Sequence, residues 1–63
     1  MKVILFVRGL ETEAQAEKLR SALEDTRLTF SVKPKDHIVM IEGDADAVYT
    51  AKVTIREAGF VIE

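Results

Sequence analysis

One histidine and a group of acidic residues are the side chains of this sequence that could bind a metal ion or transfer a proton. His37 is the only imidazole, and Glu11, Glu13 and Glu17 lie near the start of a helical pattern. His37 follows Asp36 at the tip of a predicted hairpin without evident partners, so we interpret it as a solvated turn residue. The spacing of these glutamates matches no EF-hand loop. Their favourable interaction with a helix dipole explains the carboxylates without a bound ligand.

Composition excludes several classes of protein. The chain has 63 residues, no cysteine, a net charge of -2, 48% hydrophobic and 32% charged residues. Thiolate ligands, thiol nucleophiles and disulfides are therefore excluded, and no apolar run is long enough to span a membrane. The scattered charges, with Phe6 and Phe30 expected on opposite faces, argue against nucleic-acid binding. We expect a single soluble cytoplasmic domain over residues 1–63 that is not an enzyme and has no cofactor, because the sequence supplies neither a nucleophile nor a base with an orienting partner.

Hydrophobic periodicity divides the chain into six elements. Residues 3–7, 28–33, 37–42 and 60–62 are predicted strands, and helices are predicted from residue 12 and from the loop at residues 43–46. Thr12 and Gln15 have the spacing of a capping box, and either Asp44 or Asp46 can cap the second helix. Gly59 suits a left-handed helix end.

The order strand, helix, strand, strand, helix, strand is typical of the ferredoxin-like α+β sandwich. Two split βαβ units then share a four-stranded antiparallel sheet, and both helices cover one face of it. The other face of the sheet is predicted to be open.

Two segments also resemble a known family. FVRGL at residues 6–10 and IREAGF at residues 55–60 are similar to the heavy-metal-associated domain of copper chaperones and metal-pumping ATPases. The resemblance implies the same fold and, in the family, a Met-Thr-Cys-x-x-Cys loop whose two thiolates hold a soft metal ion. Thr12 and Gln15 stand at the two cysteine positions of this chain, so the resemblance implies a degenerate metal site that lacks thiolate ligands.

The open face supplies the principal functional hypothesis. If Val3, Leu5 and Val7 face the helices, alternation places five apolar side chains on the open face. These are Ile4, Phe6, Ile38, Met40 and Val61. A contiguous exposed apolar patch of this kind favours a partner surface, so we predict a protein-interaction module that forms a homodimer or docks on a neighbouring domain.

Two alternatives remain open from the sequence. The first is a metal-binding or transport accessory protein that uses carboxylate or imidazole ligands, with Glu11, Glu13 and His37 drawn from one chain or two. The second is a small-molecule sensor similar to the ACT domains, which share this element order. No ligand-binding loop is evident for the second alternative.

Overall fold

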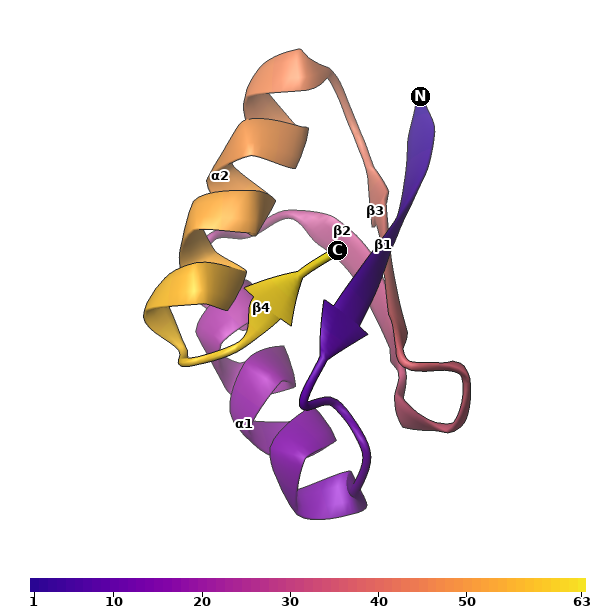
Figure 1. Cartoon of the computed structure of the whole chain (residues 1–63). Coiled ribbons are helices and arrows are strands. Elements are labelled where there is room, and N and C mark those ends of the chain that lie inside the picture. The colour runs from indigo at the N-terminus through magenta and orange to yellow at the C-terminus, as the bar shows by residue number, and fades with distance from the viewer.

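The computed structural model describes all 63 residues and contains four strands, two α-helices and one short 3-10 helix (Figure 1). In chain order these are β1 (Lys2–Arg8), α1 (Glu13–Glu24), β2 (Thr29–Lys33), η1 (Pro34–Asp36), β3 (Ile38–Glu42), α2 (Ala45–Glu57) and β4 (Val61–Ile62). The strand order is β2-β3-β1-β4, and every neighbouring pair is antiparallel. Both helices lie on the same side of the sheet (Figure 1). The fold is therefore the ferredoxin-like sandwich that the sequence predicts.

The backbone of β1 divides its hydrogen bonds between two neighbouring strands by residue parity. Odd-numbered residues bond toward β3, since the N–H of Val7 donates to the carbonyl of His37 over 2.8 Å. Even-numbered residues face β4, since the N–H of Glu63 donates to the carbonyl of Phe6 over 2.8 Å. Leu5, which is odd-numbered like Val7, lies opposite Val39 in the β1–β3 register.

The core lies between the helices and one face of the sheet. Leu5 and Val7 of β1 are 5% and 1% exposed, whereas Ile4 is 55% exposed, so the alternation of β1 has the phase that the sequence analysis assumes. The buried residues of the two helices recur at spacings of three and four, as in the apolar stripe of an amphipathic helix. They are Ala16, Leu19 and Leu23 of α1 and Val48, Ala51 and Ile55 of α2.

The bounds of all four predicted strands differ from the structure, and β1 is longer than predicted by one residue at each end. His37 belongs to the turn and not to β3, because its φ of 58° is left-handed and directly follows the 3-10 helix. Strand β2 begins at Thr29, after Arg27 turns the chain with a φ of 61°. Phe60 is only 8% exposed and packs in the core, so β4 is reduced to two residues.

Of the two candidate aspartates, Asp44 is the N-cap of α2. Its carboxylate accepts a hydrogen bond from the N–H of Ala47 over 2.9 Å, while Asp46 lies within the first turn. Gly59 follows the helix with a φ of 98°, as predicted for a left-handed end. Neither helix is long and apolar enough to cross a membrane.

Candidate functional site

The loop between β1 and α1 holds the two positions where the resemblance places metal ligands. Gly9 turns the chain with a φ of 94°, a conformation that side chains other than glycine resist. Leu10 is fully buried and anchors the loop in the core, whereas Glu11 and Thr12 are exposed. The loop therefore presents its polar residues at the N-terminal end of α1.

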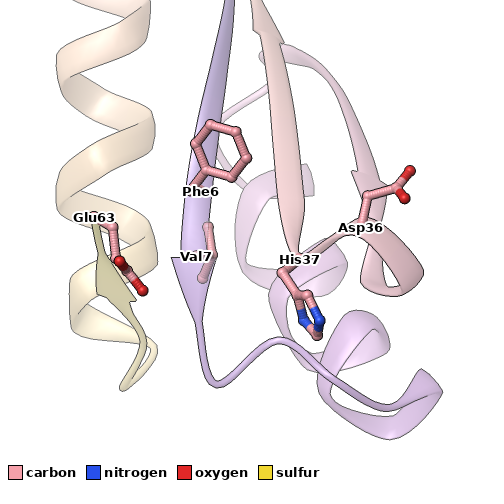
Figure 2. Close-up of a pocket in the computed structure, with 5 residues that line it drawn as sticks. All are labelled: Phe6, Val7, Asp36, His37 and Glu63. Atoms are coloured by element: carbon pink, nitrogen blue, oxygen red, sulfur yellow. The ribbon is translucent and has the colours of Figure 1, made fainter.

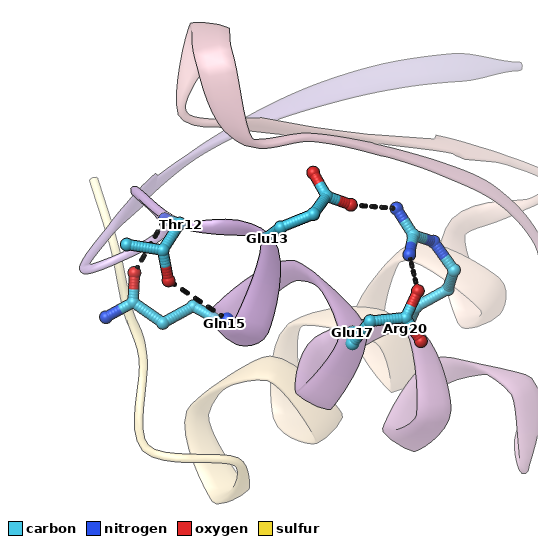
Figure 3. Close-up of polar contacts among 5 residues, drawn as sticks. All are labelled: Thr12, Glu13, Gln15, Glu17 and Arg20. Atoms are coloured by element: carbon cyan, nitrogen blue, oxygen red, sulfur yellow. Dashed lines mark hydrogen bonds and ion pairs between the residues drawn. The ribbon is translucent and has the colours of Figure 1, made fainter.

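Thr12 and Gln15 are joined by the reciprocal hydrogen bonds of a capping box (Figure 3). The N–H of Gln15 donates to Oγ1 of Thr12 over 3.2 Å, and the N–H of Thr12 donates to Oε1 of Gln15 over 2.9 Å. The same Oε1 accepts a further bond from the N–H of Glu11 at 2.9 Å. These two side chains thus satisfy backbone groups that the first turn of a helix leaves without partners.

The residues at the two ligand positions do not fit a soft metal ion. A hydroxyl and a carboxamide are neutral oxygen and nitrogen groups, whereas copper(I) selects thiolate and thioether sulfur. Both oxygens that could coordinate an ion already accept hydrogen bonds, from backbone N–H groups of the loop and of the first turn of α1. At the two positions where the resemblance places metal ligands, the structure has a capping box.

Thr12→Ala is expected to lower the free energy of unfolding by about 1 kcal/mol, because the N-cap acceptor is lost while the exposed methyl group gains nothing. Urea unfolding followed by circular dichroism measures this change. Thr12→Ser is the matched control and should stay close to the original stability, because it keeps the hydroxyl. An equal loss in both variants would contradict a capping role for the hydroxyl.

Glu13 and Glu17 of α1 are paired with a cation of the same helix (Figure 3). Arg20 contacts Glu17 through one guanidinium nitrogen and lies 3.8 Å from a carboxylate oxygen of Glu13 through the other. No group of three or more His, Asp or Glu side chains converges anywhere in the structure. Glu11, Glu13 and His37 therefore do not form the carboxylate and imidazole site of the first alternative within one chain.

The side chain of His37 contacts the loop between β1 and α1. The prediction of a solvated turn residue therefore describes only part of its environment. Its Nδ1 lies 2.7 Å from the carbonyl oxygen of Leu10. A carbonyl only accepts, so Nδ1 carries the proton and Nε2 is left without one in the neutral ring. The ring belongs to a shallow cleft of about 450 Å³ lined by Phe6, Val7, Asp36, His37 and Glu63 (Figure 2).

The open face of the sheet has an apolar centre formed by two cross-strand pairs. Ile4 lies opposite Met40, and Phe6 lies opposite Ile38, in the register of β1 and β3. Ile4 and Phe6 are 55% and 59% exposed, while Ile38 and Met40 are half-buried. We call these four residues the central patch.

Val61, the fifth predicted residue, lies on β4 of the same face, outside the two cross-strand pairs of the central patch. It is 57% exposed and pairs directly with Arg8 across β1 and β4. The guanidinium of Arg8 contacts the carboxylate of Glu63 over 3.1 Å, and both side chains are exposed. This ion pair is not predictable from sequence patterns, because it joins residues 55 positions apart and only the register of β4 brings them together.

Polar residues surround the central patch on the same face. In the register of the sheet they are Lys2, Arg8, Thr29, Ser31, Lys33, Glu42 and Glu63. An apolar centre within a polar rim is the usual anatomy of a protein–protein interface.

Solved structures of metal-binding proteins share this fold along nearly the whole chain. A heavy-metal-binding protein from Thermotoga maritima has a TM-score of 0.89 at 17% identity, over 100% of this chain and 92% of that chain. The copper chaperone Atx1 from Synechocystis PCC6803 is 28% identical over 97% of this chain and 98% of that chain, with a TM-score of 0.76. A CopZ metallochaperone is 22% identical with complete coverage of both chains and a TM-score of 0.84.

The sequence matches no protein-family model and no curated protein. The structural likeness nevertheless shows that the chain has the heavy-metal-associated fold of copper chaperones. It has no cysteine, and so it lacks the Cys-x-x-Cys motif that the resemblance places in the first loop.

Proposed function

We propose that this chain, a heavy-metal-associated fold without a thiolate pair, is a cytoplasmic, non-catalytic interaction module that binds protein through its open sheet face. The simplest partner is a second copy of the chain, and a neighbouring domain is the other. The single observation that carries the proposal is the central patch, in which Ile4 and Phe6 remain more than half exposed. Small monomeric domains have little apolar surface to leave unburied, because their cores are marginal.

The loop at the N-terminal end of α1 supports the same proposal. Thr12 and Gln15 use their side chains on backbone hydrogen bonds, and neither supplies a soft ligand. The carboxylates Glu13 and Glu17 are engaged with Arg20. These four side chains thus have structural partners, and the sheet face is the distinctive surface of the molecule.

Phe6→Glu is expected to raise the dissociation constant of self-association by at least about 30-fold. A charge placed at the centre of the interface loses the apolar contact and must be desolvated, which is the size of effect seen at interface hot spots. Sedimentation velocity across the micromolar range measures the change. The fold should survive, because the side chain of Phe6 lies outside the core.

Ser31→Glu is the matched control, because Ser31 lies opposite Met40 on the rim of the same face. It introduces the same charge and should change the dissociation constant by less than about threefold, as rim substitutions do. Equal weakening by both variants would contradict a contact centred on Phe6. A chain that stays monomeric at every concentration would exclude the homodimer.

A further inference from the structure

Two opposite charges lie side by side at one end of the central patch. Lys2 of β1 and Glu42 of β3 are opposite each other in the register, and each lies two positions from a residue of the central patch. Their side chains therefore point to the open face, because a strand alternates with a period of two. Both residues are exposed, and neither takes part in an ion pair within the chain. These two charges are available to a partner.

The other end of β1 carries a charge that already has a partner. Arg8 lies two positions beyond Phe6, and its guanidinium contacts the carboxylate of Glu63 over 3.1 Å. The two ends of the open face along β1 thus differ. One end has a cation and an anion without ion-pair partners, and the other has a closed ion pair.

A face-to-face contact between two copies has two aligned arrangements. Packed sheets keep their strand directions within about 30° of each other, so a twofold axis through the central patch runs either along the strands or across them. The first axis brings like ends of the two faces together, and the second brings opposite ends together. Both bury the same four apolar residues, so apolar contact alone does not distinguish the two arrangements.

We infer, on the basis of the proposed function, that two copies pack through their open faces about a twofold axis along the strands, between β1 and β3, so that Lys2 of each copy meets Glu42 of the other. Rotation about this axis exchanges β1 and β3. Each residue of one face then lies on its own register partner from the other copy. The central patch packs on itself in this way, and the contact of Lys2 with Glu42 is made twice.

The reversed arrangement gives Lys2 no anionic partner. An axis across the strands exchanges the two ends of β1, so it places Lys2 of one copy over Arg8 of the other. Arg8 is a second cation, and its charge is already paired with Glu63. Charge complementarity therefore favours the arrangement in which like ends meet.

The same two charges favour a second copy over an unrelated domain. A twofold contact requires a surface that is complementary to itself. Lys2 and Glu42 meet this requirement without any other chain, because they lie on opposite sides of the axis. Sheets packed face to face are about 10 Å apart, a distance that a lysine and a glutamate side chain span together.

Charge reversal tests how the two copies are oriented. Lys2→Glu leaves two carboxylates at this end of each copy, and Glu42→Lys leaves two ammonium groups, so each variant alone brings four like charges together. Each dissociation constant should rise at least about tenfold. An equimolar mixture of the two variants joins an anionic end to a cationic end, and it should associate within about threefold of the unchanged chain. Sedimentation velocity of each variant alone and of the mixture measures these values.

Lys52→Glu is the matched control, because Lys52 is exposed on α2, on the side of the sheet away from the open face. It makes the same change in net charge and should alter the dissociation constant by less than about threefold. Circular dichroism checks that all variants fold. Equal weakening by Lys52→Glu would trace the effect to net charge and overturn the inference.

The mixture separates this inference from the proposed function. A mixture that associates no more tightly than its components would overturn the meeting of like ends, while weakening by Phe6→Glu would still support the open face as the contact. A chain that stays monomeric at every concentration would overturn the second copy as the partner, and a neighbouring domain would then be the partner that the proposed function retains.

Discussion

Replacing Thr12 and Gln15 together by cysteine is expected to create a copper(I) site where the unchanged chain has a capping box. The two positions lie one turn apart at the N-terminal end of α1, and the loop that carries them is anchored by the buried Leu10. Backbone N–H groups and the helix dipole favour thiolates there, and two thiolates select a soft ion. Copper(I) affinity should rise at least about 1,000-fold.

Competition with a coloured copper(I) chelator measures this affinity, and calorimetric melting with and without copper(I) gives an independent readout. Without metal, the double variant should be about 1 kcal/mol less stable, because the cap is lost. Glu11→Cys combined with Ala14→Cys is the matched control, since it has the same spacing shifted by one residue. If both pairs bind copper(I) equally well, the ligand positions assigned to Thr12 and Gln15 are wrong.

Leu19→Ala is expected to lower the free energy of unfolding by about 2–5 kcal/mol, which is the usual cost of a cavity in a packed core. Leu19 is fully buried at the centre of α1 and has no solvent-facing side into which neighbouring groups could relax. A domain of this size has a total stability of only about 3–9 kcal/mol, so much of the population should unfold at physiological temperature.

Thermal and urea unfolding followed by circular dichroism give this change in stability. Lys18→Ala is the control, because Lys18 precedes Leu19 in the same helix and is exposed. Its stability should stay within about 0.5 kcal/mol of the original. A loss below about 1 kcal/mol for Leu19→Ala would show that the core around α1 is loosely packed.

The fold was predictable from the sequence because its signals are local. The three-residue spacing of Thr12 and Gln15 fixes the start of α1, and the apolar stripe through Ala16, Leu19 and Leu23 fixes its buried face. The phase of β1 is harder to predict, since the strand is apolar on both faces. Alternation alone leaves open whether Leu5 or Ile4 is buried, and packing against the helices decides it.

Features of the candidate site that join distant segments were not predictable. The bond from His37 to the carbonyl of Leu10 joins residues 27 positions apart, and it depends on a left-handed turn that the sequence does not require. The shortness of β4 has a similar cause, because Phe60 is drawn into the core instead of continuing the strand. Such contacts depend on how the elements pack, and periodicity carries no information about that.

The side chains of β1 alternate between two different surroundings. Leu5 and Val7 are buried beneath the helices, whereas Ile4 and Phe6 are more than half exposed on the central patch. A substitution at an even-numbered position of β1 therefore changes the surface of the molecule and leaves the packing of the core unchanged, so one strand can vary the two properties independently.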